Sequence, residues 1–263
     1  MKANRQSIME QYILQNGEVD MRTLQDRFQV SLSTLRRDLS ALEERGTVRK
    51  VYGGVQTVQP HFLTSFSERR PLNLEAKERI GRWAAGLIKD GSTVYIDSGS
   101  TTGCVMPNIK ECGKLTVVTN SLTALESART LKGANIITPG GVYNSSLDSF
   151  MDAAALEKLR KFSFDVAVMA ATGVSIEHGL SNTTYLEAQI KQVAVQKSRR
   201  ILLLCDHTKL ERNAPMQYCP LEEIDMLITD RRPPEKYMRF FSRFSIGVVY
   251  DEETAKEALH AMG

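Results

Sequence analysis

Hydroxyl and guanidinium side chains gather on one side of a short segment near the N-terminus. At 100° per residue, a helix beginning after Ser31 turns Leu35, Leu39 and Leu42 inward. The opposite, outward side carries Ser33, Thr34, Arg36, Arg37 and Ser40, and Ser31 is suited to cap the helix. An arginine fork can pair with O6 and N7 of guanine, and hydroxyl groups can reach phosphates or base edges. The pattern therefore predicts a helix that contacts DNA.

The neighbouring elements are those that a DNA-reading helix needs. Helical spacing over 8–16 and 21–28, followed by a tight connection, predicts a helix-turn-helix. After the third helix stops at Gly46, residues 47–52 alternate like a strand and reverse at two glycines. This candidate wing would bring Arg49 and Lys50 to a phosphate backbone. The alternative is a small three-helix bundle whose arginine pair is simply solvated.

A second set of polar residues follows the apolar strands predicted further along the chain. The first of these loops is Asp97, Ser98, Gly99, Ser100, Thr101 and Thr102. Its glycine, three hydroxyls and free amides would suit an anion, phosphate above all, although such a loop can also be an ordinary polar turn. Other candidates at strand ends or on the following helix are Thr119, Asn120, Gly140, Gly141, Lys191, Asp206 and Lys209, each of which could also serve as a cap, a turn or a solvated charge.

Alternating strands and helices would place these loops together. Strands are predicted at 93–97, 115–119, 135–138, 165–170, 200–205, 225–229 and 245–250, and helices at 73–88, 121–131, 152–161, 184–197 and 234–243. This order predicts an α/β domain with a mostly parallel sheet covered on both faces, and ligands bind beyond the carboxyl ends of such strands. Pro107 should kink or shorten the helix expected after the Ser-Thr-Thr loop.

Composition sets the outer limits. The 263 residues, 42% hydrophobic and 25% charged, are expected to form two domains: 1–57, a linker over 58–72, and 73–263. The net charge of +3 permits nucleic-acid binding without arguing for it. The four cysteines form no CxxC pair, so we expect reduced thiols. No apolar run has the length of a membrane span or the pattern of an export signal. We therefore expect a cytoplasmic protein. Scattered histidines and absent nucleotide-binding motifs predict neither a metal nor a cofactor.

Residues 30–54 read VSLSTLRRDLSALEERGTVRKVYGG, which resembles the DNA-binding segment of DeoR-type transcription regulators. Further matches in order are KERIGRWAAGLIKDGSTVYIDSGSTT, LTVVTNSLTALE, ITPGG, FDVAVMAATGVSIEHGL and ILLLCDHTKL. The resemblance implies a winged helix-turn-helix joined to an effector domain with a fold similar to ribose-5-phosphate isomerase and the CoA-transferases. It further implies an operator-binding repressor of carbohydrate use that assembles as a dimer or tetramer and senses a phosphorylated sugar.

The same resemblance raises an alternative, a sugar-phosphate isomerase with a DNA-binding appendage. Isomerase-like sequences carry an Asp-Gly-Ala-Asp-Glu string after the strand at 165–170, where this chain has Ala170-Ala171-Thr172-Gly173. Glu187 matches the isomerase general base, and it and Gly173 are expected at the effector site. Retained binding residues beside lost acids favour a sensor without catalysis. Phe150-Met151-Asp152 replaces a glycine that many family members have near this point, so the pocket edge should differ.

Overall fold

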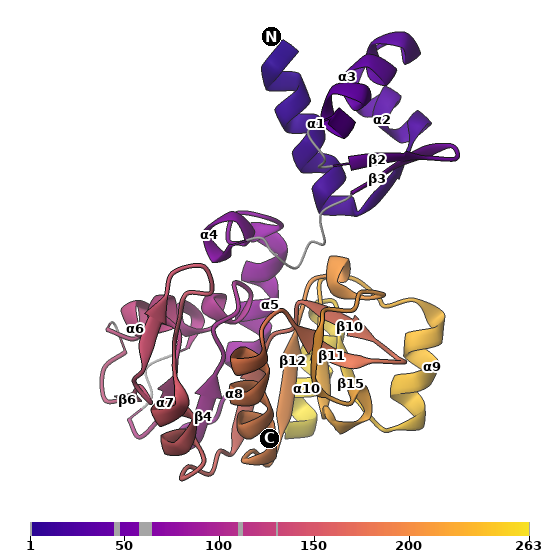
Figure 1. Cartoon of the computed structure of the whole chain (residues 1–263). Coiled ribbons are helices and arrows are strands. Elements are labelled where there is room, and N and C mark those ends of the chain that lie inside the picture. The colour runs from indigo at the N-terminus through magenta and orange to yellow at the C-terminus, as the bar shows by residue number, and fades with distance from the viewer. Residues whose placement is uncertain (1, 45–47, 58–64, 110–112, 130, 263) are drawn as a thin grey trace. The chain divides into compact units, whose positions relative to one another are not determined.

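The structure is a computed structural model that describes residues 2–44, 48–57, 65–109, 113–129 and 131–262 (Figure 1). The chain divides into two units, Met1–Thr64 and Ser65–Gly263. Of the expected linker 58–72, residues 58–64 lie outside the described residues, and those from Ser65 onward belong to the C-terminal unit. Within the described ranges, no helix has the length and apolar character needed to cross a bilayer. Nor do three or more His, Cys, Asp or Glu side chains there form a group able to hold a metal ion.

The N-terminal unit is a three-helix arrangement completed by a small sheet. Its elements are α1 (Lys2–Asn16), β1 (Glu18–Asp20), α2 (Met21–Phe28), α3 (Leu32–Glu44), β2 (Val48–Val51) and β3 (Gly54–Thr57). Gln29, with φ of 50°, turns the chain between α2 and α3. The three strands pair antiparallel in the order β1-β3-β2, so the predicted wing is present and β1 is an addition. Leu35, Leu39 and Leu42 are fully buried in the core of this unit, as predicted.

A seven-stranded sheet forms the centre of the C-terminal unit (Figure 1). In spatial order the strands are β15 (Gly247–Val249), β14 (Met226–Ile228), β12 (Ile201–Leu204), β9 (Val166–Met169), β4 (Thr93–Ile96), β5 (Thr116–Thr119) and β6 (Asn135–Ile137). Every neighbouring pair is parallel, which confirms the predicted sheet. The carboxyl ends of the strands therefore meet at one edge, where a ligand site is expected.

Helices cover both faces of this sheet. The helices are α5 (Leu74–Gly86), α6 (Leu122–Ala128), α7 (Ala153–Leu159), α8 (Tyr185–Gln196), α9 (Glu235–Arg243) and α10 (Glu252–Met262). Apolar residues of α5, α6 and α10 pack with Val94 and Ile96 on one face. Those of α7, α8 and α9 pack with Tyr95 on the other. Because successive side chains of a strand point to opposite faces, the almost continuous apolar strands serve both layers.

Several short elements were not predicted. They are a hairpin of β7 (Val142–Asn144) and β8 (Ser149–Met151), an antiparallel sheet of β10 (Gly173–Ser175), β11 (Gly179–Asn182) and β13 (Met216–Cys219), helix α10, and the four-residue helix α4 (Phe66–Arg69). Helix α4 lies in the segment expected to be a linker. Ser65 and Glu68 form its capping box, and Phe66 is buried while its N–H donates to the Ser146 carbonyl at 2.7 Å. These contacts fix α4 within the C-terminal unit.

The loop after β4 does not continue into an α-helix. Two 3₁₀ turns, Thr102–Cys104 and Met106–Asn108, take its place, and Pro107 stands at the start of the second. This outcome agrees with the shortening expected from a proline that lacks the backbone N–H. At the pocket edge, Met151 is buried and Asp152 caps α7 by accepting from the Ala155 N–H at 2.7 Å.

Candidate functional sites

The outer face of α3 is open to solvent. Ser31 Oγ accepts a hydrogen bond from the Thr34 N–H at 3.3 Å, as a cap should. Arg36 and Arg37 are exposed, as is Ser33, whereas the leucines of α3 are buried on its other side. The predicted DNA-contacting side chains therefore share an accessible helix face, which is the geometric requirement for entering a major groove.

One basic residue of the wing, Lys50, joins it to α3, and another, Arg49, joins the two strands of the wing. Lys50 Nζ donates to Ser40 Oγ at 2.7 Å and lies 3.0 Å from a carboxylate oxygen of Glu43. Arg49 donates to Gln56 Oε1 across the hairpin, at 2.9 Å from its nearer terminal nitrogen. Tyr52, at the tip, is fully exposed and was not among the predicted contacts. The hydrogen bond between Lys50 and Ser40 thus fixes the position of the wing relative to α3. Both side chains also belong to the predicted DNA-contacting surface.

A buried acid fixes the position of α3, and sequence reasoning missed it. Asp38 is fully buried and accepts from Arg5 Nε at 2.8 Å and from Gln6 Nε2 at 2.9 Å, and both donors are on α1. A second nitrogen of the Arg5 guanidinium lies 2.7 Å from the same carboxylate. Such an ion pair with two further hydrogen bonds restricts how one helix can slide on the other.

Asp38→Asn should lower the free energy of unfolding of the N-terminal unit by about 1–3 kcal/mol, because the charge that binds Arg5 is lost within a buried site. Urea unfolding followed by circular dichroism measures the change, with the exposed Asp26→Asn as the matched control. A loss equal to that of the control would contradict the positioning role.

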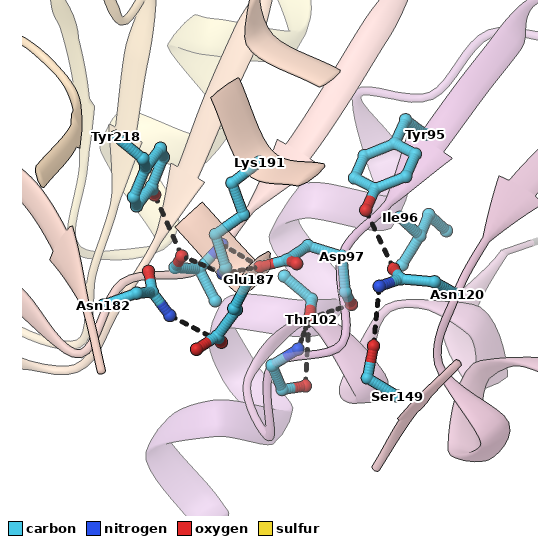
Figure 2. Close-up of polar contacts among 12 residues, drawn as sticks. Tyr95, Ile96, Asp97, Thr102, Asn120, Ser149, Asn182, Glu187, Lys191 and Tyr218 are labelled. Carbon is cyan, nitrogen blue, oxygen red and sulfur yellow. Dashed lines mark hydrogen bonds and ion pairs between the residues drawn. The ribbon is translucent and has the colours of Figure 1, made fainter. Parts of the chain in front are cut away.

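The loop after β4 closes tightly against the end of β9 (Figure 2). Thr102 Oγ1 accepts from the Gly99 N–H at 2.9 Å and donates to the Asp97 carbonyl at 2.6 Å. A Cβ added to Gly99 would lie 2.3 Å from that of Ala170, so only glycine fits. Ser98 and Thr101 are buried, and Ser100 is half-buried. Thr102 therefore shapes the loop that sequence reasoning proposed for an anion.

A buried ion pair joins this loop to α8. Lys191 Nζ bonds Asp97 Oδ2 and also donates to the Ala170 carbonyl at 2.7 Å. The same Asp97 oxygen accepts from the Ala170 N–H at 3.0 Å, and Tyr218 Oη donates to the Ala170 carbonyl at 2.9 Å. Asp97 and Lys191 are 1% and 2% exposed. The structure thus brings together two predicted site residues that lie 94 positions apart in the sequence.

Glu187 is one turn from Lys191 on the same helix (Figure 2). Its Oε1 accepts from Asn182 Nδ2 at 2.6 Å, and its Oε2 from Thr183 Oγ1 at 3.4 Å. Burial raises the pKa of Glu187, while the charge of Lys191 acts in the opposite direction. Asn182 was not predicted, and nothing local in the sequence distinguishes it from a loop asparagine.

Cations collect near the same strand ends. Burial lowers the pKa of Lys77 to about 8, with Lys209 and Arg69 acting in the same direction and Asp206 opposing them. The pKa of Lys209 is also lowered by burial, again opposed by Asp206. Lys77, Lys209 and Arg69 thus interact electrostatically with one another, and Asp206 interacts with both lysines. Mutual repulsion and burial leave this cluster suited to an anion.

Arg69 and Lys77 were both missed as candidates. The Lys77 ammonium donates to the Arg69 carbonyl, and the guanidinium of Arg69 is within electrostatic reach of Glu187, Asp97 and Asp148. Burial lowers the pKa of Arg69, and its Nε is shielded from solvent without a partner among the described residues. The spacing of Lys77 offered a signal: it shares the buried face of α5 with Ile80 and Ala84, where a lysine is unusual.

Other predicted site residues have structural duties in the fold. Thr119 Oγ1 donates to the Ile96 carbonyl at 2.6 Å. The Asn120 amide accepts from Tyr95 Oη at 2.8 Å and donates to Ser149 Oγ at 2.6 Å (Figure 2). Gly140 and Gly141 have φ of 86° and 109°. A Cβ on Gly173 would lie 2.5 Å from the Arg212 carbonyl. Asp206 Oδ1 accepts from the Thr208 N–H at 2.9 Å.

Family models match both units. Residues 5–61 match the DeoR-like helix-turn-helix domain, and residues 72–231 match the DeoR C-terminal sensor domain. The chain belongs to the DeoR family. It is therefore a DNA-binding transcription regulator, as its sequence had suggested. The site at the carboxyl ends of the parallel strands, around Asp97, Glu187 and Lys191, lies in the sensor domain.

Curated relatives resemble the chain along most of its length. The regulator IolR of Bacillus subtilis (strain 168) is 34% identical, over 94% of this chain and 99% of the relative. The glycerol-3-phosphate regulon repressor of Escherichia coli (strain K12) is 30% identical, over 86% and 90%. The repressor GlcR of B. subtilis (strain 168) is 30% identical, over 92% and 93%.

Solved structures with a similar fold are more distant. Ribose-5-phosphate isomerase A of Methanocaldococcus jannaschii is 17% identical with a TM-score of 0.37, over 52% of this chain and 55% of that one. The eIF2B beta subunit of Chaetomium thermophilum is 14% identical with a TM-score of 0.43, over 69% and 55%. The chain spans about half the length of these structures.

Proposed function

We propose that this DeoR-family regulator is a repressor of a carbohydrate-utilisation operon, released from its operator by a phosphorylated sugar or a related metabolite. The observation that carries the effector class is the group of Arg69, Lys77 and Lys209, in which the Lys77 ammonium donates to the Arg69 carbonyl and Arg69 interacts electrostatically with Asp97 of the loop after β4. Burying cations in mutual repulsion costs free energy that a phosphate dianion offsets on binding. Repression is the sense carried by the printed names of the E. coli glycerol-3-phosphate relative and of GlcR.

The DNA-bound form is proposed to be a dimer or tetramer acting in the cytoplasm. A single small helix-turn-helix makes few base contacts, and symmetric pairs of recognition helices read paired half-sites. Effector in the sensor domain favours one arrangement of the assembly over another, by no more than its difference in affinity for the two states. The exposed face of α3 supports this use of the N-terminal unit.

The site residues favour a sensor that binds its effector without catalysing a reaction. Lys191 is bound by Asp97 and the Ala170 carbonyl, and Glu187 is held by Asn182, so neither stands free as a base. Residues 170–173 read Ala-Ala-Thr-Gly, so the acids that isomerase-like sequences carry at this point are missing. Incubation of the pure protein with aldose phosphates tests the alternative, because accumulation of ketose phosphate would establish an isomerase.

Selection of duplexes from a random-sequence DNA pool supplies an operator for the direct test. The complex is then challenged with aldose, ketose and polyol phosphates and with the same sugars lacking phosphate. A phosphate ester should release the DNA and raise the thermal unfolding midpoint, since ligand binding to the native state stabilises it. Failure to enrich any duplex would refute DNA binding, and release by the unphosphorylated sugars alone would refute the phosphate site.

The affinity for the tightest ester of that panel should fall as pH rises above 8. Below its pKa of about 8, Lys77 is already charged in the empty site. Above that value, pairing with phosphate requires uptake of a proton, so affinity falls by at most about tenfold per pH unit. Titration calorimetry between pH 7 and 9.5 measures the slope. Lys77→Arg should flatten it because a guanidinium stays charged, and a flat profile in the unaltered protein would remove Lys77 from the phosphate site.

A further inference from the structure

Strand β7 is the exposed strand of the hairpin that it forms with β8. Residues 141–146 are all exposed, and they include two large hydrophobic side chains, Val142 at 69% and Tyr143 at 40%. On its inner side β7 pairs antiparallel with β8, where Ser149 and Met151 are buried. Within the described part of the chain, β7 pairs with no strand other than β8. The hairpin therefore presents a free strand edge to solvent.

The contacts of β8 show which backbone groups face this edge. The Phe150 N–H donates to the Asn120 carbonyl at 2.8 Å, so the backbone of Phe150 is directed away from β7. Tyr143 lies directly opposite Phe150 in the hairpin. In an antiparallel ladder, two opposite residues that do not bond each other direct their N–H and C=O groups to the two outer sides. The N–H and C=O of Tyr143 therefore point outward, and neither has a hydrogen-bond partner among the described residues.

The rest of the C-terminal unit holds the hairpin in place. Ser149 Oγ accepts from Asn120 Nδ2 at 2.6 Å (Figure 2), and the Ser146 carbonyl accepts from the Phe66 N–H of α4 at 2.7 Å. The rings of Tyr143 and Phe150 pack together with their centroids 5.1 Å apart. A second strand that pairs with β7 would therefore have little backbone to order, which lowers the entropic cost of association.

The composition of this edge favours a second copy of the chain as its partner. Exposed edge strands usually carry charges or proline, which prevent pairing. Strand β2, an edge of the N-terminal sheet, follows this rule with Arg49 and Lys50. In contrast, residues 141–146 read Gly-Val-Tyr-Asn-Ser-Ser, without charge or proline. Two such strands can meet around a twofold axis with no like charges opposite each other, and the outward N–H and C=O of Tyr143 complement the same two groups of a second copy.

We propose that β7 pairs antiparallel with β7 of a second copy around a twofold axis at Tyr143, which joins two sensor domains through a continuous sheet in the order β8-β7-β7-β8. The two Tyr143 residues then exchange N–H···O=C hydrogen bonds, and Val142 of each copy lies opposite Asn144 of the partner subunit. The inference rests on the proposed function in one respect, because the reading of paired half-sites is what requires a second copy. It goes further by placing the contact between the copies on one strand and in one register.

Charged pairs on β7 test both the pairing and its register in the full-length protein. Val142→Lys with Asn144→Lys places like charges opposite each other, whereas Val142→Lys with Asn144→Glu places opposite charges there. Sedimentation velocity over a range of protein concentrations measures self-association. The first variant should raise the dissociation constant about tenfold or more, and the second should keep it within about threefold of the unaltered value. Tyr185→Lys with Gln192→Lys, at two exposed positions of α8, is the matched control.

Three outcomes would overturn the pairing. Self-association of both β7 variants equal to that of the control would show that the copies meet elsewhere. Equal weakening in both variants would contradict the twofold register. A protein that stays monomeric at every concentration would leave this edge to a strand of a different protein. None of these results bears on the proposed function, which is tested separately by the release of the selected duplex with phosphate esters.

A covalent cross-link provides a second measurement that does not depend on added charge. The Cα atoms of a hydrogen-bonded antiparallel pair lie about 5.5 Å apart, which is within the reach of a disulfide. Tyr143→Cys should therefore give a covalent dimer on mild oxidation, measured by electrophoresis without reductant. The exposed Tyr185→Cys and the unaltered protein, with its own cysteines, are the controls. A yield of dimer no higher than in these controls would overturn the contact at Tyr143.

Discussion

Lys191→Met is expected to destabilise the C-terminal unit by about 3–5 kcal/mol, because it leaves the Asp97 carboxylate buried without its cation. Asp97 is 1% exposed and would keep only the Ala170 N–H, at 3.0 Å, as a donor to its bonded oxygen. Methionine approximates the length of the lysine stem, so little of the loss comes from packing. The chain has a single tryptophan, Trp83 on α5. Its fluorescence in urea therefore follows the unfolding of this unit.

A double variant separates the lost pair from lost packing. Adding Asp97→Asn to Lys191→Met removes the stranded charge, so the double variant should regain part of the stability that the single variant loses. A cost below about 1 kcal/mol for Lys191→Met would contradict a buried pair, because that size is typical of surface ion pairs. A double variant less stable than the single one would show instead that Asp97 supports the loop through its other contacts.

The sequence predicted the large elements because their periodicity is strong. All seven strands of the parallel sheet are near-continuous apolar runs, and the leucines of α3 recur at helical spacing. The short strands β1, β7, β8 and β10 have three residues each, as do β6, β14 and β15, but they lack the near-continuous apolar runs that predicted those three. Val142 and Tyr143 on β7 are exposed, so even their hydrophobicity gave no inward face. Helix α4 was hidden because four residues leave only a capping box to detect.

Some site residues could be predicted because they directly follow a strand. Asp97 and Lys191 were proposed from their positions and Glu187 from the resemblance. The ion pair between Asp97 and Lys191, however, depends on the parallel strand order that sets β4 beside β9. Asn182 stands on β11, where it pairs with Met216 of β13, a strand distant in the sequence. Arg69 reaches the same acids from α4, in a segment interpreted as a linker. Long-range placement, which no local pattern encodes, decided these cases.

The double substitution of Arg36→Ala and Arg37→Ala on the outer face of α3 should cause the largest loss of operator affinity. Arg37→Ala alone should weaken specific binding by about 1–3 kcal/mol if the guanidinium pairs with a guanine, and a similar contact by Arg36 would add a comparable amount. Both side chains are exposed, so thermal unfolding of the variants should stay close to that of the unaltered protein. Fluorescence anisotropy with the selected duplex measures the affinity.

The dependence on salt and on base sequence distinguishes reading from simple attraction. A lost base contact lowers the preference for the selected duplex over its point variants, whereas a lost phosphate contact weakens all duplexes alike and reduces the salt slope by about one. Arg239→Ala, an exposed arginine on α9 in the other unit, is the matched control and should change neither quantity. If the α3 double variant retained the affinity and preference of the control, α3 would not be the recognition helix. The buried Asp38 fixes α3 relative to α1 and keeps Arg36 and Arg37 on the solvent side. We therefore expect the preference of the protein for particular DNA sequences to depend on these two arginines.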